Sequence, residues 1–282
     1  MKSFVRRVAT FGSIVGLLFG ASATAPAALA LSEEEILDKL ESIPVFTVTD
    51  AEGAPLIATI TNAGNSGETT EVAGVFIDAE DARRFVERLK SQQPDIGDDV
   101  QVTVISLAEI YRLDRENTNN NTPIEFSYIP TQEDVEAAVS VFIENERQSE
   151  LRQVQDANGE TQYQFPGVPL FLATAGPNQG YMTLEYNGEV VIPAFFDRED
   201  LNNVLERFRQ QQPEVADSVQ IEVVQLEGTI EALENEDNPV LQQLMLVPDS
   251  DSLEFVQNLV DDIESPSGDA EIPEIELPTG NE

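Results

Sequence analysis

The sequence predicts an α+β fold made of two pseudo-symmetric repeats, each a β-sheet with helices packed on it. Residues 78–107 are restated at 197–226 with a constant offset of 119 residues. In both copies a run with apolar residues at helical spacing is followed by a run in which they alternate, as in a half-buried strand. The 282 residues are 41% hydrophobic, enough to fill a core. Two copies of so long a unit indicate a duplicated module, not a solenoid of short repeats.

The identical positions of the two copies are mostly acids, glutamines and valines. In the first copy they are Asp78, Glu80, Asp81, Glu87, Arg88, Gln92, Gln93, Pro94, Asp98, Val100, Gln101, Val104 and Leu107. Each recurs 119 residues later. The repetition places corresponding helices and strands in the two halves of the chain.

Residues 1–30 have the pattern of a secretory signal peptide. Lys2, Arg6 and Arg7 precede an apolar stretch from Val8 to about Gly20, and Ala28-Leu29-Ala30 offers a cleavage site. The apolar stretch is shorter than the roughly 20 residues of a membrane-spanning helix. We therefore expect an exported protein that begins near Leu31 and has no integral membrane anchor.

The first repeat is expected at residues 31–150. Ser32 and Glu35 form a capping box that predicts an opening helix. The patterns that follow predict, in order, strands at 44–49, 56–61 and 71–77, a helix at 78–93, a strand at 100–104, a short helical turn near 107–113, a strand at 126–130 and a helix from 131. A polar loop is expected at 62–69 and an asparagine-rich loop at 117–121. The last helix should close the unit.

The second repeat is expected at residues 151–264, in the same order. Asn187-Gly188 lies between two alternating runs, which predicts a tight type I′ hairpin where the first repeat has its polar loop. Asp156-Ala157-Asn158-Gly159 predicts either another hairpin or a mobile connector. Residues 265–282 are acidic and rich in proline without apolar periodicity, so we expect a disordered tail.

The residue inventory excludes most catalytic and metal chemistry. The chain has no His and no Cys, which removes the Ser-His-Asp and Cys-His constellations and nearly every transition-metal site. No phosphate-binding glycine motif is present, so we expect no cofactor. The acid pairs at 80–81 and 199–200 stand at predicted helix starts, where capping explains them. Asp249-Ser250-Asp251-Ser252 resembles part of a calcium loop, but it too precedes a helix, so capping is the favoured interpretation and we expect no metal.

The net charge of −38 opposes binding to nucleic acid and to anionic membranes. It favours basic partners, or it serves only solubility and adaptation to salt.

Two segments of the second half are apolar on both alternating faces, at 169–173 and 190–196. Such strands are either buried on both faces, between helices and the other half, or they line a groove. In the second case we expect a hydrophobic cleft for extended or amphipathic polypeptide. Its candidate lining is aromatic: Phe46, Phe76, Phe171, Tyr181, Tyr186, Phe195 and Phe196.

These same segments resemble a known family. The motifs IPVFTV at 43–48, GVPLF at 167–171, GYMTL at 180–184, VIPAFFD at 191–197 and QQQP at 210–213 are similar to those of the twenty-two-kilodalton Tic subunit family. It comprises an intermembrane-space component of the chloroplast inner-envelope translocon and its cyanobacterial homologues. The resemblance implies a butterfly-like α+β fold with hydrophobic pockets and no catalytic motif. It also implies a periplasmic location, or the thylakoid lumen.

The function implied is that of a non-enzymatic, chaperone-like protein-transport factor. It would bind unfolded precursor or outer-membrane proteins and act with the Omp-type assembly machinery. A scaffold subunit of an envelope translocation or assembly complex is the alternative, in which the apolar strands are simply core. A third possibility, an acid-pair hydrolase, requires two carboxylates with perturbed pKa values in one cleft.

Overall fold

The computed structural model describes residues 30–61, 69–117, 124–155, 158–176 and 178–264. The predicted signal peptide and acidic tail lie outside these ranges, apart from residue 30, and so do nearly all of the two predicted loops at 62–69 and 117–121. None of the helices within the described ranges is long and apolar enough to cross a membrane.

The first half of the chain alternates short helices with the strands of one sheet. Its elements are α1 (Glu33–Leu40), β1 (Pro44–Asp50), β2 (Ile57–Thr61), β3 (Thr69–Phe76), α2 (Ala79–Gln92), α3 (Pro94–Gly97), β4 (Val100–Ser106), α4 (Leu107–Asn117), β5 (Ile124–Ile129) and α5 (Gln132–Glu144). The predicted capping box opens α1, because the Ser32 hydroxyl accepts the Glu35 N–H and the Glu35 carboxylate accepts the Ser32 N–H.

The second half restates that order after a connector. The connector holds η2 (Gln148–Glu150), β6 (Arg152–Gln155) and β7 (Thr161–Gln164); then follow β8 (Pro169–Ala175), β9 (Gly180–Tyr181), β10 (Leu184–Tyr186), β11 (Glu189–Phe195), α6 (Arg198–Gln211), α7 (Pro213–Ala216), β12 (Gln220–Gln225), α8 (Leu226–Asn235), α9 (Pro239–Gln243), β13 (Leu244–Val247) and α10 (Ser250–Glu264). Both α2 and α6 start after an Asp N-cap and end two residues before a proline, close to where the sequence predicted.

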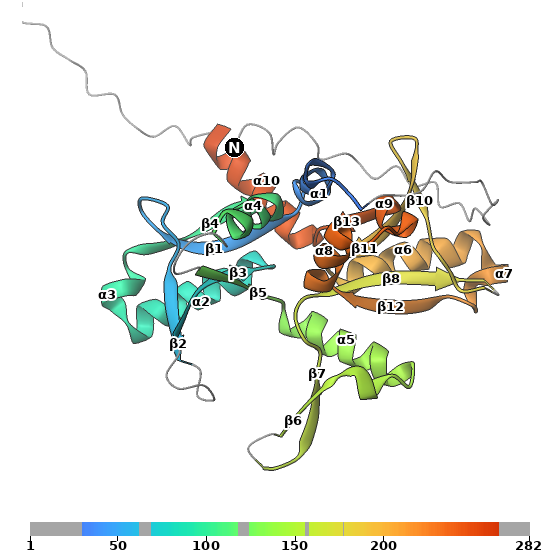
Figure 1. Cartoon of the computed structure of the whole chain (residues 1–282), viewed down its shortest axis with the longest axis horizontal. Coiled ribbons are helices and arrows are strands. Elements are labelled where there is room, and N and C mark those ends of the chain that lie inside the picture. The colour runs from blue at the N-terminus through green and yellow to red at the C-terminus, as the bar shows by residue number, and fades with distance from the viewer. Residues whose placement is uncertain (1–29, 62–68, 118–123, 156–157, 177, 265–282) are drawn as a thin grey trace, which may run out of the picture.

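The two sheets have the same strand order. In the first it is β2-β3-β1-β4, with β5 parallel to β3; in the second it is β10-β11-β8-β12, with β13 parallel to β11 and β9 paired to β8 (Figure 1). The register also matches, since Phe46 faces Phe76 and Phe171 faces Phe195. The predicted α+β class is confirmed. The spatial symmetry of the repeats and the butterfly-like outline stay predictions.

Two predicted hairpins are present. The β10–β11 hairpin turns through Asn187 and Gly188, whose φ angles of 53° and 84° are both in the left-handed region that a type I′ turn requires. In the connector, β6 and β7 pair as a separate two-stranded hairpin that projects from the body of the molecule (Figure 1). Of the two alternatives for the connector, the hairpin is therefore the observed one.

One hydrophobic core joins the two halves. Val45 and Val75 of the first sheet and Leu170 and Ile192 of the second belong to a single buried cluster. Residues of α1, α4, α8 and α9 complete it. Because β1 and β8 each send alternate side chains into this cluster, each sheet has an inner face on the shared core and an outer face on the other side.

The closing helices exchange partners between the halves. Although α5 follows the first sheet in sequence, its Ala138, Val141 and Phe142 pack in one cluster with Phe171 and Phe195 of the second sheet. Reciprocally, α10 follows the second sheet but packs on the outer face of the first. The expectation that each closing helix completes its own unit is wrong, because the outer apolar face of each sheet is covered by the other half's helix. The boundaries 31–150 and 151–264 stay a prediction about the duplication along the chain.

Candidate functional site

Five of the seven residues predicted to line a groove are core residues. Phe46 and Phe171 are completely buried, and Phe76, Phe195 and Phe196 are at most 5% exposed. In this structure they therefore line no open groove. The alternative weighed from the sequence, that these strands are buried on both faces, describes what is observed.

The structure separates the seven residues into different places. Phe46 and Phe76 share the outer cluster of the first sheet, Phe171 and Phe195 share that of the second, and Phe196 lies in the shared core. The two tyrosines are nearer the surface. Tyr181 is 40% exposed on β9, and Tyr186 is half-buried on β10.

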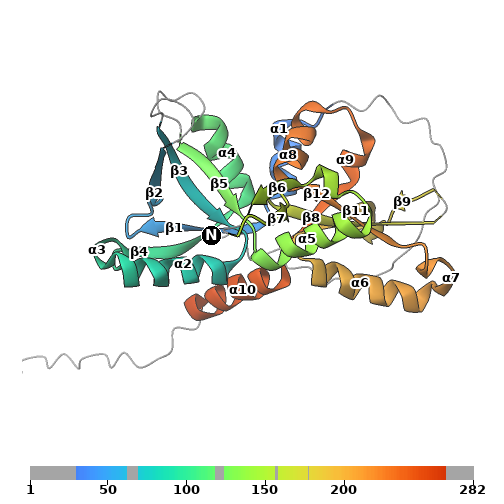
Figure 2. The same ribbon diagram turned by 90° about the horizontal axis from the view of Figure 1, so that it is seen from below.

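The outer face of the first sheet is an apolar surface that is buried beneath α2 and α10. We call it the first outer face and define it by Phe46, Val48, Phe76, Ala82 and Val86, of which the last two come from α2. From α10, the Phe255 ring packs edge-on against Phe46, with centroids 5.4 Å apart and an interplanar angle of 79°. Figure 2 shows α10 lying alongside α2 on this side of the molecule.

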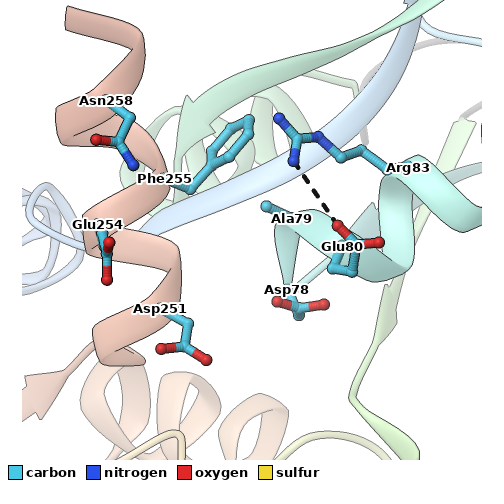
Figure 3. Close-up of a pocket in the computed structure, with 8 residues that line it drawn as sticks. All are labelled: Asp78, Ala79, Glu80, Arg83, Asp251, Glu254, Phe255 and Asn258. Atoms are coloured by element: carbon cyan, nitrogen blue, oxygen red, sulfur yellow. Dashed lines mark ion pairs between the residues drawn. The ribbon is translucent and has the colours of Figure 1, made fainter. Parts of the chain in front are cut away.

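A pocket of about 280 Å³ remains between α2 and α10 (Figure 3). Its walls combine carboxylates with one aromatic ring and one cation, and the lining residues are Asp78, Ala79, Glu80, Arg83, Asp251, Glu254, Phe255 and Asn258. The Arg83 guanidinium lies 4.4 Å from the centre of the Phe255 ring and 3.7 Å from the Glu80 carboxylate. The pocket thus separates two helices that carry mostly like charges toward each other.

The first turns of four helices meet beside this pocket, in a region that we call the seam. It is defined by Asp78, Asp134, Asp197, Asp200 and Asp249 at the starts of α2, α5, α6 and α10. Within it, Asp78 accepts the Asp81 N–H at 2.8 Å and Asp197 accepts the Asp200 N–H at 2.6 Å. The predicted capping role of Asp249 is confirmed, since it accepts the Ser252 N–H at 3.0 Å.

Burial raises the pKa of three of the seam carboxyls. Desolvation is the first cause of the raised pKa of Asp78, of Asp134 and of Asp197, which reaches about 7. The charges of Asp134, Asp200 and Asp249 add to the effect at Asp197. The acids that cap these helices therefore also repel one another across the seam.

Asp134 is the seam residue that sequence reasoning missed. It is 6% exposed, and it accepts the Thr131 hydroxyl at 2.6 Å and the backbone N–H of Arg198 at 3.2 Å, which joins α5 to α6. The spacing of Thr131 and Asp134 is that of a capping box and could have indicated the helix start. No local pattern could have indicated the contact with Arg198, 64 residues away.

The described carboxylates do not assemble a metal centre. Over the described ranges, no group of three or more Asp or Glu side chains could hold a metal ion. The seam acids already accept backbone N–H groups, which accounts for their positions as caps. What this region offers chemically is a covered apolar face with an acidic rim.

Comparison with known proteins identifies the family. The model of the Tic22-like family matches residues 5–258. A solved structure described as Anabaena Tic22 (protein transport) superposes with a TM-score of 0.65 at 24% identity, over 81% of this chain and 97% of that one. The structure of Tic22 from Plasmodium falciparum superposes with a TM-score of 0.58 at 20% identity, over 82% of this chain and 98% of that one. No curated protein matches the chain. At these identities the two structures establish the fold, whereas the family match spans nearly the whole sequence. The chain therefore belongs to the Tic22-like family.

Proposed function

We propose that this protein is an exported, chaperone-like protein-transport factor that binds precursor polypeptides and supports outer-membrane or envelope biogenesis. The observation that carries the proposal is the family match over residues 5–258, in a family where a similar structure is described by protein transport. Residues 1–30 support export to the periplasm, or to the thylakoid lumen, because they have the composition of a cleavable signal peptide.

The mechanism would be reversible burial of apolar client segments without nucleotide and without catalysis. Clients would be unfolded precursors or outer-membrane proteins, handed to the Omp-type assembly machinery. A net charge of −38 supports the solubility of such a complex, because like-charged particles repel one another.

A scaffold function is the second candidate, and one observation favours it. The predicted groove phenylalanines are packed in closed cores. A protein that uses them only as core would bind one folded envelope partner and would not hold unfolded chains.

The two candidates are separated by an aggregation assay. A β-barrel outer-membrane protein would be diluted from urea into buffer without nucleotide, with mature protein (residues 31–282), and light scattering followed. An unrelated soluble protein of similar negative charge, at equal concentration, controls for acidity. We expect the mature protein alone to suppress scattering. Absence of suppression, combined with stoichiometric binding to folded assembly machinery, would replace the chaperone by the scaffold.

A further inference from the structure

The two closing helices occupy equivalent places but are held very differently. In α5, Ala138, Val141 and Phe142 are buried. In α10, Ser252 is the one buried side chain among residues 250–261, whereas Phe255 and Val256 are half-buried and Leu259 is 37% exposed. Since apolar burial is the main force that seats a surface helix, α10 is the more weakly seated of the two.

Polar contacts hold α5 at both ends. At its start, Asp134 accepts the Arg198 N–H. Past its end, the Asn145 side-chain amide donates to the Ile221 carbonyl at 3.2 Å, and Arg147 pairs with Glu222 at 2.8 Å. The helix is thus fixed to the second half of the chain at both ends, and its buried side chains pack on the second sheet between them.

Side-chain hydrogen bonds to other elements hold α10 at its first turn only. The Ser250 N–H and hydroxyl both donate to Asp200 at 2.9 Å, and the Ser252 hydroxyl donates to the Ile77 carbonyl at 3.3 Å. No side chain of residues 253–261 makes a hydrogen bond outside the helix; Gln257 bonds Asp261 within it. No described element follows α10, so a rotation about Ser250–Ser252 would move no other described element.

Carboxylates that face one another across the pocket weaken the packing of α10 against α2. Asp251 and Glu254 of α10 line it together with Asp78 and Glu80 of α2. Like charges across a gap repel, and Arg83 is the one cation among the described residues that line the pocket. We propose that α10 is a displaceable cover, and that an amphipathic helix of a client polypeptide binds the first outer face in its place.

The chemistry of the occupant follows from what α10 supplies and what it lacks. An aromatic side chain would replace Phe255 between Phe46 and Arg83, which retains both the ring–ring and the cation–π contact. A basic residue in place of Glu254 would pair with the carboxylates that now face one another, giving the client an advantage over α10. The occupant is thus an apolar and basic amphipathic helix, bound in the helix-in-groove mode. This inference rests on the function proposed above and names its binding site.

Opening of the cover can be measured without any client, because the chain has no native cysteine. Val48→Cys would place a single thiol on the first outer face, and Ala173→Cys would place one at the equivalent position beneath α5; the native side chains are 3% and 5% exposed. Because labelling of a buried thiol reports local opening, we expect the thiol at 48 to react with maleimide at least about tenfold faster than the thiol at 173. Equal rates in two folded variants would overturn the proposal.

Binding can be tested by locking the cover. Ala79→Cys with Asn258→Cys puts two thiols in the pocket walls and leaves its carboxylates in place. The thiols are to be joined by a short bismaleimide, and the same variant capped with a monofunctional maleimide is the matched control. The probe is a labelled synthetic peptide with the sequence of residues 249–264 carrying Glu254→Lys. We expect the lock to weaken peptide binding at least about tenfold, because affinity scales with the open fraction. Unchanged binding would contradict the displacement.

The aggregation assay then separates the two proposals. If the capped variant suppresses aggregation and the locked one does not, both stand. If both suppress it equally, the cover is overturned and the proposed function survives. If neither the variants nor the unmodified protein suppress aggregation, the proposed function fails and client binding at this face fails with it.

Discussion

At the scale of one residue, the carboxyl group of Asp197 shows how much stability the folded protein loses when a seam acid is ionised. Burial is the largest cause that raises its pKa to about 7, and the hydrogen bond that it accepts from the Asp200 N–H opposes the rise. Asp134, Asp200 and Asp249 face it from α5, α6 and the start of α10. A folded-state pKa above the unfolded value means that the folded protein binds the proton more tightly. Stability from this group is therefore present at acidic pH and is lost as the pH rises from about 4 through 7.

We predict that Asp197→Asn stabilises the protein at pH 8. Asn keeps the capping oxygen but carries no charge, so the variant avoids the cost of an ionised buried group. Thermal unfolding should show a melting temperature a few degrees above wild type at pH 8, with the difference vanishing near pH 4. Asp95→Asn, at an exposed carboxylate away from the seam, is the control. An equal difference between Asp197→Asn and wild type at both pH values would refute this account.

Gly97 is required where α3 meets the end of α2. A Cβ at this position would lie 2.4 Å from the backbone nitrogen of Lys90, and backbone cannot move aside as a side chain can. We predict that Gly97→Ala lowers the free energy of unfolding by about 1–3 kcal/mol, the usual cost of overpacking. The repeat provides the control, because Ala216 stands at the equivalent position. Chemical denaturation should show a smaller loss for Ala216→Gly, of about 0.5–1 kcal/mol; equal losses would contradict the steric explanation.

At the scale of elements, α5 and α10 differ in how deeply their aromatic side chains are buried. Phe142 of α5 is 7% exposed, and its ring centroid lies 5.7 Å from that of Phe165, whereas Phe255 of α10 is only half-buried. The cost of truncating a buried ring to alanine is about 3–5 kcal/mol. Truncating a half-buried ring to alanine, on a helix that opens locally, should lower the free energy of unfolding by less.

We therefore predict that Phe142→Ala destabilises the whole protein by about 3–5 kcal/mol. For Phe255→Ala we expect less than half of that loss in global unfolding, together with faster exchange of the α10 amides. Denaturant unfolding followed by circular dichroism gives the first quantity and hydrogen exchange gives the second. If Phe255→Ala proved as costly as Phe142→Ala, α10 would be part of the global folding unit.

At the scale of the whole molecule, the halves are joined by more than the shared core. The Lys39 ammonium donates to the carbonyls of Gln242 and Leu244, both at 2.9 Å, and the Tyr111 hydroxyl donates to Glu234 at 2.7 Å. Burial lowers the pKa of Lys39, so its charge is retained at a cost that the two carbonyls offset. Because of these contacts and the exchanged helices, we expect the two repeats to unfold as one unit.

We predict that residues 31–150 do not fold in isolation. The fragment would expose Val45 and Val75 on the inner face and Phe46 on the outer face, and its α5 would lack the second sheet. Far-ultraviolet circular dichroism of the fragment should show little native structure, and the full protein should unfold in a single transition. A fragment that melts cooperatively on its own would show instead that the repeats are independent domains.

The sequence predicted most of the longer elements of this fold because their signals are local, whereas the short α3, α7, α9 and β9 were not predicted. Capping residues, prolines after helices and the Asn187-Gly188 turn act within a few residues, and the structure confirms them. The exchange of α5 and α10 was not predictable in this way, because helical periodicity reveals an apolar face but not the sheet that it covers. The seam was missed for the same reason, since Asp134 meets Arg198 only through the fold. The continuous apolar run at 169–173 indicated a strand that is apolar on both faces, but it could not distinguish a core from a groove.

Hydrogen–deuterium exchange of the mature protein, alone and with the synthetic peptide of residues 249–264 carrying Glu254→Lys, tests the central claim most directly. In the free protein we predict that the amides of α10 exchange faster than those of α5. With the peptide bound, α10 should exchange still faster while β1, β3 and α2 stay protected, because the peptide helix has taken its place. If α10 were as protected as α5 and unchanged by the peptide, it would be a fixed part of the core, and the account of a displaceable cover would be wrong.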